Sequence, residues 1–260
     1  MKPVLFSFGA IHLYSYGLSI ALGVLLALFL MNRRALRTGF PKPDEVFDMA
    51  FTILVWGFAG ARLFYVIQNL SYYAAEPLKI FAVWEGGLIF YGGAIMAFAG
   101  MLLVGRKRKW PFWKTLDFIM PYGALTHAFG RVGCFLNGCC YGKACDLSWA
   151  VRFPEVPYKV HPTQLYEAIF DLVLFAFLIA RRERARFEGE IALLYFLLYG
   201  FGRYLIEFLR EPSWLWLGLT SNQWLSAVII LASFILYRFL KSKVCPEVRH
   251  HFQDVLSGKR

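Results

Sequence analysis

The sequence has few charged residues for its length. Asp, Glu, Lys and Arg make up 17% of the 260 residues, whereas soluble domains carry about a quarter. Hydrophobic residues reach 58%, and the mean hydropathy is +0.50. This composition excludes an ordinary soluble domain and indicates an integral membrane protein.

Nucleic-acid-binding motifs are missing as well. A net charge of +11 would suggest nucleic acid in a soluble domain, but the Lys and Arg residues here form short blocks between apolar runs. Such blocks are typical of topology signals and of contacts with anionic bilayer lipid. We therefore expect bilayer lipid and no nucleic acid among the partners.

We also expect the first apolar run to stay as an anchor, because it is too long for a signal-peptide core and lacks a small-residue cleavage site. Runs of about 18 apolar residues or more can cross the hydrocarbon core as helices. Seven runs qualify, and the fourth, with His127 and Arg131, is interrupted by polar residues. The runs are 13–31, 46–67, 87–104, 115–136, 165–180, 190–209 and 223–240.

Basic residues alternate along the connections between these runs. The first, third and fifth connections and the tail are rich in Lys and Arg, whereas 68–86, 137–163 and 210–222 are poorer. Basic loops stay in the cytoplasm. We therefore predict an all-α integral membrane protein of about seven transmembrane helices with a broken or re-entrant segment, its N-terminus outside and its C-terminus cytoplasmic. Residues 1–260 are expected to form a single domain, with an outward-facing loop at 137–163 and a cytoplasmic tail at 241–260.

Several ionisable residues lie within the apolar runs or at their rims, where a charge costs at least about 2.5 kcal/mol. The stretch GRYLIEFLRE places three of them on one helical face. Two interpretations stay open for this face: an interior stack of ion pairs, or capture of a phosphate by the fork of Arg203. The full set is Asp48, Arg62, Asp117, His127, Arg131, Glu167, Asp171, Arg203, Glu207 and Arg210.

Glycines fall into two kinds of pattern. GFAGARLFY (57–65) and EGGLIFYGG (85–93) place small residues three or four apart, which predicts close packing of helices. GRVGCFLNGCCYG (130–142) has four glycines, more than a straight helix favours, so we expect a helix break that lines a cavity.

The cysteines do not have the paired C-x-x-C spacing of structural zinc sites. Four of them are separated by five, one and five positions. We therefore predict neither a metal nor a cofactor. Three interpretations remain: a disulfide at an oxidising outer face, free structural thiols, or a redox or covalent role. The residues are Cys134, Cys139, Cys140 and Cys145.

Several motifs, in this order, resemble those of the prolipoprotein diacylglyceryl transferase family over nearly the whole chain. They are IHLYSYGLSIALG, FDMAFTILVWGFAGARLFYV, WEGGLIFYGG, GRVGCFLNG followed by YG, HPTQLYE, GRYLIEFLREP and SNQWLS. The resemblance implies an enzyme of the bacterial inner membrane whose site faces outward. Such an enzyme transfers diacylglycerol from phosphatidylglycerol to the lipobox cysteine of a preprolipoprotein, forms a thioether and releases glycerol 1-phosphate.

The resemblance also implies roles for individual residues. Arg131 and Arg203 would bind the phosphoglycerol head. The other substrate-binding candidates shape its pocket, support it or fix the outer loop, and we include one further intramembrane arginine. They are Tyr16, Asn137, Gly142, Arg62, His161, Gln164, Glu207 and Arg210.

The chain departs from the family pattern at three positions. Tyr91 stands where the family has a histidine, and Cys134 and Cys139 replace an asparagine and a glutamate. A histidine base at position 91 is therefore excluded. Nearby arginines can favour a thiolate, and His127, one helical turn before Arg131, is the remaining histidine for proton removal; a structural role is its alternative.

Tyr91 is interpreted either as a hydrogen-bond donor to the lipid head or as an aromatic residue of the membrane interface. The altered residues also keep other functions open. These are a divergent paralogue acting on another lipid acceptor, a non-catalytic lipid-binding protein and a thiol-redox protein.

Overall fold

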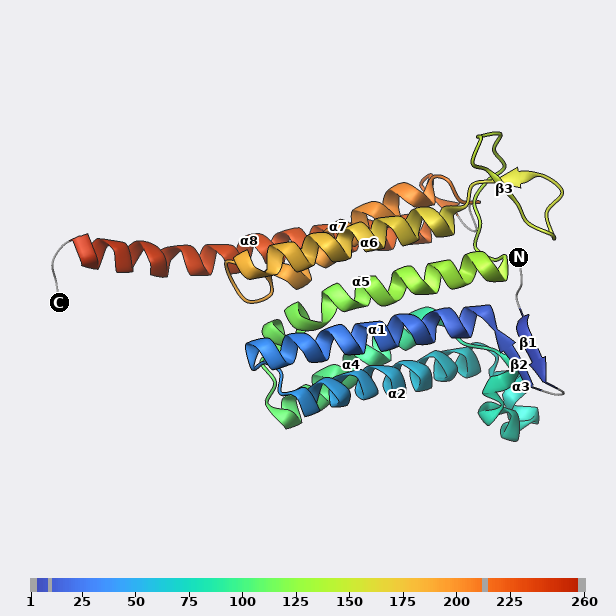
Figure 1. Cartoon of the computed structure of the whole chain (residues 1–260), viewed down its shortest axis with the longest axis horizontal. Coiled ribbons are helices and arrows are strands. Elements are labelled where there is room, and N and C mark those ends of the chain that lie inside the picture. Colours follow the sequence, from blue (N-terminus) through green and yellow to red (C-terminus); the bar gives the residue numbers. More distant parts are fainter. Residues whose placement is uncertain (1–3, 9–10, 212–214, 257–260) are drawn as a thin grey trace. The chain divides into compact units, whose positions relative to one another are not determined.

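A computed structural model describes residues 4–8, 11–211 and 215–256 of the chain (Figure 1). These residues are mostly helical, with three short antiparallel strand pairs. The chain divides into two compact units, Met1–Ala27 with Leu116–Arg260 and Leu28–Thr115. Helices α1 (Ser15–Thr38) and α5 (Phe112–Asn137) contribute residues to both units. The single domain expected over 1–260 stays a prediction.

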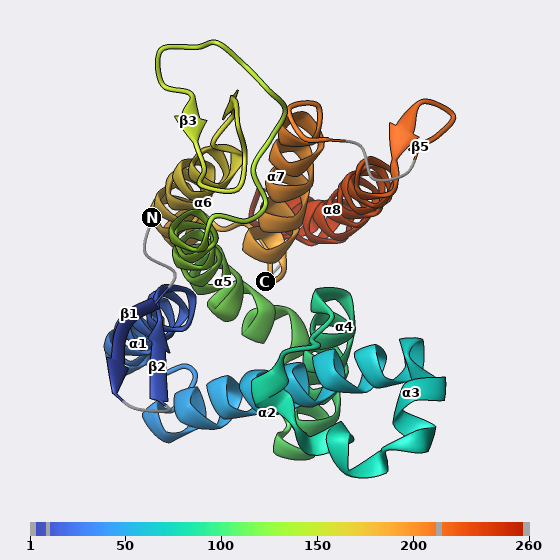
Figure 2. The same ribbon diagram turned by 90° about the vertical axis from the view of Figure 1, so that its right-hand side faces the viewer.

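The first unit holds the C-terminal helices. Its further elements are β1 (Val4–Phe8), β2 (Ile11–Tyr14), β3 (Val151–Arg152), β4 (Lys159–Val160), α6 (Thr163–Arg181), η3 (Arg182–Arg184), α7 (Glu190–Glu207), β5 (Leu215–Trp216), β6 (Leu219–Thr220) and α8 (Ser221–Leu256). α6 packs against α7 and α7 against α8, as Figure 2 shows. A buried core of Ala124, Leu174, Leu178 and Ile191 joins α5, α6 and α7.

The helix break expected within 130–142 lies later than the glycines suggested. α5 is continuous from Phe112 to Asn137 and includes Gly130 and Gly133. The chain leaves the helix only at Gly138, whose φ is +79°. Each internal glycine costs a helix about 1 kcal/mol, and burial of the neighbouring Ala124, Leu125 and Ala128 outweighs that cost. The helix therefore ends within the expected stretch 130–142, at its third glycine.

The segment that follows α5 is an ordered structure with its own small core. Phe153, Val156 and Val160 are buried together, and the rings of Tyr141 and Phe153 stack at 5.1 Å. The pairing of β3 with β4 closes this core. No strand was expected here from the sequence, and the outward orientation of 137–163 stays a prediction.

The first turn of α7 is held by a carboxylate from α5. Asp117 Oδ2 accepts a hydrogen bond from Gly189 N at 2.7 Å, and Oδ1 accepts one from Ala192 N at 2.8 Å. The opening N–H groups of a helix lack partners within the helix. Asp117, predicted only as an ionisable residue in an apolar run, therefore serves as a cap from a neighbouring helix.

The second unit is built on a close helix pair. It contains α2 (Pro43–Gln68), α3 (Leu70–Ala75), η1 (Pro77–Phe81), η2 (Val83–Glu85) and α4 (Phe90–Arg108). A Cβ added at Gly60 of α2 would lie 2.6 Å from the carbonyl oxygen of Gly92 on α4. Such closeness leaves room only for glycine, so the predicted packing of the two small-residue motifs is confirmed.

Arg62 is buried in the second unit, and backbone carbonyl groups accept hydrogen bonds from its guanidinium group. Nε donates to Ile80 O at 2.8 Å, Nη1 to Gly86 O at 2.6 Å and Nη2 to Lys79 O at 2.6 Å. Two further bonds reach the carbonyls of Ala82 and Gly87. A guanidinium has five N–H donors, and all five are used. We therefore assign Arg62 a structural role in place of the substrate-binding role expected from the sequence.

Within the part of the chain that the structure describes, four helical segments are long and apolar enough to cross a membrane. They are Ser15–Thr38, Pro43–Gln68, Thr163–Arg184 and Ser221–Lys243. Burial is inverted relative to a soluble protein, because Glu167 and Asp171 are buried while Leu231 and Phe234 of α8 are exposed. Polar groups inside and apolar groups outside are expected of helices in lipid.

The packing of α2 on α4 predicts the effect of single methyl groups. Gly60→Ala should lower the apparent melting temperature in detergent, because the new Cβ would overlap Gly92 and Met96; overpacking costs about 1–3 kcal/mol. Gly57→Ala on the same helix is the matched control, since its Cβ would meet Ala97 at an ordinary 3.6 Å. Equal melting temperatures for the two variants would contradict this account of the packing.

Candidate functional site

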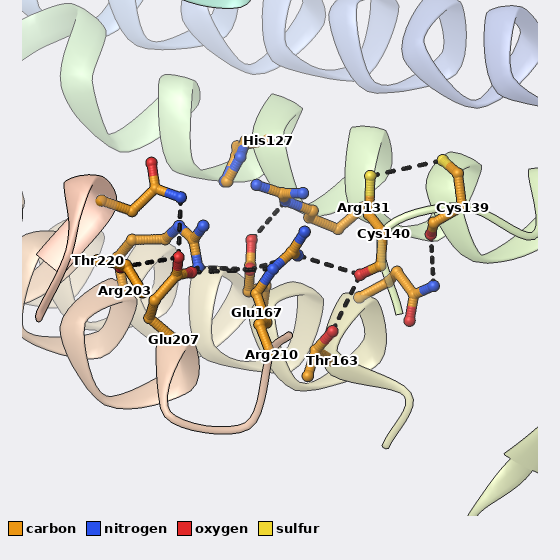
Figure 3. A network of polar contacts seen from close by, with 12 residues as sticks. His127, Arg131, Cys139, Cys140, Thr163, Glu167, Arg203, Glu207, Arg210 and Thr220 are labelled. Atoms are coloured by element: carbon orange, nitrogen blue, oxygen red, sulfur yellow. Dashed lines mark hydrogen bonds and ion pairs between the residues drawn. The ribbon is translucent and has the colours of Figure 1, made fainter. Parts of the chain in front are cut away.

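One buried carboxylate lies at the centre of three arginines. Glu167 of α6, with 3% of its side chain exposed, contacts Arg131 Nε of α5 at 2.5 Å through Oε2. Its Oε1 lies 3.4 Å from Arg203 Nη1 and 3.8 Å from Arg210 Nη1. Figure 3 shows the three guanidinium groups converging on this side chain. The fold therefore brings together three arginines that lie up to 79 positions apart in the sequence.

A second carboxylate, Glu207, connects this cluster to the start of α8. Its Oε2 lies 2.7 Å from Arg203 Nη1 and 3.8 Å from Arg210 Nε. Its Oε1 accepts hydrogen bonds from Thr220 Oγ1 at 3.0 Å and from Asn222 Nδ2 at 2.9 Å. Glu207 thus holds Arg203 in place and ties the end of α7 to the beginning of α8.

The cluster of Arg131, Arg203, Arg210, Glu167 and Glu207 has an excess of positive charge. Three guanidinium groups and two carboxylates leave one positive charge without an opposite charge inside the cluster. The carboxylate of Asp171, one turn from Glu167 on α6, also lies within electrostatic reach of Arg131, so the charges of the whole site are close to balanced. Guanidinium forks match the oxygens of a phosphate group.

His127 is paired with a carboxylate on the same two helices. Its Nδ1 lies 2.6 Å from Oδ2 of Asp171, whose side chain is 1% exposed. His127 and Arg131 are one turn apart on α5, and Asp171 and Glu167 are one turn apart on α6. The two pairs therefore form successive contacts between the helices. With Nδ1 bonded to a carboxylate, Nε2 is the ring nitrogen left to accept a proton.

The residues of HPTQ hold the segment after α5 through its backbone. Gln164 Nε2 donates to Cys139 O at 2.5 Å, and Thr163 Oγ1 donates to Cys140 O at 3.0 Å. Arg210 Nη1 donates to the same Cys140 O at 3.0 Å. These contacts agree with the loop-fixing role expected for Gln164.

Gly142 and His161 join the two ends of this segment. Gly142 N donates to His161 O at 2.9 Å, and the next residue, Lys143, donates from N to Leu209 O at 2.8 Å. A Cβ on Gly142 would meet Leu209 O and would lie 2.7 Å from Thr163 Cγ2. Gly142 therefore lets two backbone segments approach each other, and its part in shaping the lipid pocket stays a prediction.

All four cysteines of the expected group are free thiols in the structure. The prediction of a disulfide among these four cysteines was therefore wrong. Cys134, Cys139 and Cys140 have their sulfur atoms within 4.8 Å of one another, whereas Cys145 lies outside this group. The spacing along the sequence gave no sign of this convergence.

The Cys140 thiol has an unusual electrostatic environment. Interactions with Cys134 and Cys139, together with the positive charges of Arg210 and Arg131, lower the pKa of the Cys140 thiol below its ordinary value. Cys140 is also exposed. A lowered pKa with access to the outside favours the thiolate, the reactive form of cysteine.

The remaining predicted residues are found in different places. Tyr16, in the first turn of α1, lies within electrostatic reach of the three grouped thiols and of Arg131. Asn137 is the last residue of α5. Tyr91 is the second residue of α4 and belongs to the second unit, as Arg62 does. Its half-exposed ring contacts the edge of Phe90.

Two buried carboxylates next to the arginines and His127 were missing from the site expected from the sequence. Glu167 and Asp171 had been noted only as ionisable residues in an apolar run. Their spacing of four positions repeats the spacing of His127 and Arg131. Matching pairs on two helices are a signal of facing contacts, and this signal was available in the sequence.

Apolar helices around a group of arginines and buried carboxylates define an integral membrane protein with a polar, charged site. The profile of the prolipoprotein diacylglyceryl transferase family matches residues 3–239. The chain belongs to this family.

Named relatives cover most of the chain. A phosphatidylglycerol–prolipoprotein diacylglyceryl transferase of Clostridium tetani is 36% identical over 243 residues, which are 91% of this chain and 97% of the relative. The protein of the same name from Geobacter sulfurreducens is 39% identical over 82% of this chain and 84% of its own length. That from Pasteurella multocida is 39% identical over 89% and 87%.

The central position of Glu167 predicts a large effect of removing its charge. Glu167→Gln should lower the apparent melting temperature in detergent strongly, because three guanidinium groups lose a shared partner; breaking a buried pair costs about 3–5 kcal/mol. Glu183→Gln is the control, since Glu183 is 61% exposed in its pair with Arg182, and exposed pairs contribute about 0–1 kcal/mol. A Glu167→Gln protein as stable as the control variant would refute the central role.

Proposed function

We propose that this protein transfers the diacylglyceryl group of phosphatidylglycerol to the lipobox cysteine of preprolipoproteins. The reaction forms a thioether, releases glycerol 1-phosphate and is the first step of lipoprotein maturation. Membership of the family and the printed names of the relatives support this assignment. The observation that carries it is the convergence of three arginines on the buried Glu167, because their guanidinium groups match the oxygens of the lipid phosphate.

The proposal includes the setting of the enzyme. The protein is placed in the bacterial inner membrane with about seven crossings, its N-terminus outside and its site toward the outer face. The alternation of basic and less basic connections supports this topology. An outward site would meet secreted preprolipoproteins at the membrane surface.

The arginines have a clear task in the transfer. Attack by the thiol sulfur on the glyceryl carbon forms the C–S bond and breaks the C–O bond to phosphate. The electron pair of that C–O bond stays on the phosphate oxygen, so the leaving glycerol phosphate gains one negative charge. Arg131 and Arg203, fixed by Glu167 and Glu207, are positioned to stabilise this growing charge.

Proton removal from the thiol is assigned to His127. Its Nδ1 is engaged by Asp171, so Nε2 accepts the proton and the carboxylate stabilises the imidazolium that forms. This pair supplies a base in a chain that has Tyr91 where the family has a histidine. For Tyr91 itself, hydrogen bonding to a lipid head and a place among the aromatic residues of the membrane interface both stay predictions.

The arginine assignment is tested with purified protein in detergent, phosphatidylglycerol and a lipobox peptide. We expect the peptide to gain the mass of a diacylglyceryl group, and Arg131→Ala and Arg203→Ala each to lower kcat/KM by at least about 100-fold. Arg184→Ala, at an exposed position of η3, should leave kcat/KM unchanged.

Binding of phosphatidylglycerol without any change in peptide mass would contradict the transfer. It would favour a divergent paralogue with another lipid acceptor, the alternative suggested by Tyr91, Cys134 and Cys139. Equal losses in all three arginine variants would contradict the specific role of the cluster.

The base assignment predicts a particular pH profile. The kcat/KM of the unmodified protein should fall as the pH is lowered, because a protonated imidazole cannot accept the thiol proton. His127→Gln should be slower by about 100-fold or more near neutral pH, and its rate should keep rising toward the ordinary thiol pKa of about 8.5, where the thiolate forms without a base. A variant whose rate lags by the same factor at every pH, or that only melts earlier, would show His127 to be structural.

A further inference from the structure

Three cysteine side chains meet where α5 ends. Cys134 lies in the last turn of α5, and Cys139 and Cys140 follow the turn at Gly138. Their sulfur atoms all lie within 4.8 Å of one another. Sγ of Cys139 and Sγ of Cys140 are 3.6 Å apart. Three thiol groups this close together form a donor set of the kind that soft metal ions prefer.

The distances between the three sulfur atoms suit an ion such as Zn²⁺. A Zn–S bond is about 2.3 Å long, so two sulfurs of a tetrahedral site lie about 3.8 Å apart. The observed separations, at most 4.8 Å, require movements of about 1 Å or less. Three protein ligands leave the fourth position of a tetrahedral ion open, as in catalytic zinc sites.

The surroundings hold the group in place and balance its charge. The carbonyls of Cys139 and Cys140 are fixed by Gln164, Thr163 and Arg210. Three thiolates around a divalent ion carry one net negative charge. The guanidinium of Arg210 lies close enough to Cys140 to oppose this charge, since it is bonded to the carbonyl of the same residue.

We propose that Cys134, Cys139 and Cys140 bind one divalent, thiophilic cation of the zinc class and leave its fourth position to the thiol of the acceptor peptide. The second part rests on the proposed function, because that function supplies the acceptor. On binding, the sulfur–metal bond forms, the S–H bond breaks, and the thiol proton passes through water to Nε2 of His127, the base assigned above. A metal-bound thiol is deprotonated outright, so the site would hold the nucleophile ready beside Arg131.

This site would explain the Cys134 and Cys139 departures together. Both cysteines replace oxygen-bearing residues of the family pattern, and both contribute sulfur to the same group. Tyr16 lies within electrostatic reach of all three thiols. The cysteine group and the arginine cluster meet at Arg131 and Arg210, where a thiol and a lipid phosphate have to come together.

Cadmium binding tests the site without any enzymatic readout. Reduced, metal-free protein is titrated with Cd²⁺, and the ultraviolet charge-transfer band of Cd–thiolate bonds is recorded. We expect one Cd²⁺ per chain, with affinity reduced at least about tenfold in Cys134→Ser, Cys139→Ser and Cys140→Ser. Cys145→Ser is the control and should bind as the unmodified protein does. An unchanged band in the variant with all three serines, or no band at all, would overturn the proposal.

The open position is tested with Co²⁺ in place of Cd²⁺. A lipobox peptide with cysteine should change the visible spectrum of the bound Co²⁺, and the same peptide with serine should not. Identical spectra with both peptides would overturn the acceptor part. Full transferase activity in protein freed of metal would also overturn that part and would leave the transferase assignment standing. Stoichiometric Cd²⁺ binding without any transfer would support the metal site and count against the proposed function.

Discussion

The ion pairs of Glu167 fix the arrangement of the first unit. Arg131 comes from α5, Arg203 from α7 and Arg210 from just beyond α7, and all three meet the one carboxylate on α6. Charges in such surroundings are stable only where opposite charges meet them. The three helices therefore have little freedom to slide, because a shift of one turn would separate Arg131 from Glu167 and His127 from Asp171 at the same time.

The two units satisfy their buried arginines in different ways. Arg203 is held by the carboxylates of Glu167 and Glu207 through Nη1. Arg62 is held by five backbone carbonyls, which use every donor and leave nothing for a ligand. Both arginines lie within apolar runs of the sequence, 46–67 and 190–209, so only the contacts distinguish them.

The sequence predicted the features that depend on local pattern. Apolar runs marked where helices such as α2 and α6 lie, and the spacing of small residues predicted the contact of Gly60 with Gly92. Features that depend on tertiary structure were missed. The grouping of Cys134 with Cys139 and Cys140 requires the positive φ of Gly138 and Cys140, which spacing alone does not encode. The helix through Gly130 and Gly133 is stabilised by packing, which overrides the low helix propensity of glycine.

The segment after α5 is anchored by its carbonyl groups. Gln164, Thr163 and Arg210 bond to the backbone oxygens of Cys139 and Cys140 and make no demand on the side chains at those two positions. The backbone conformation at these two positions therefore does not depend on which side chains they carry. Substitution at positions 139 and 140 can exchange a carboxylate for a thiol on an unchanged scaffold. Such a loop gives an evolving membrane enzyme a place to acquire new reactivity while its fold stays intact.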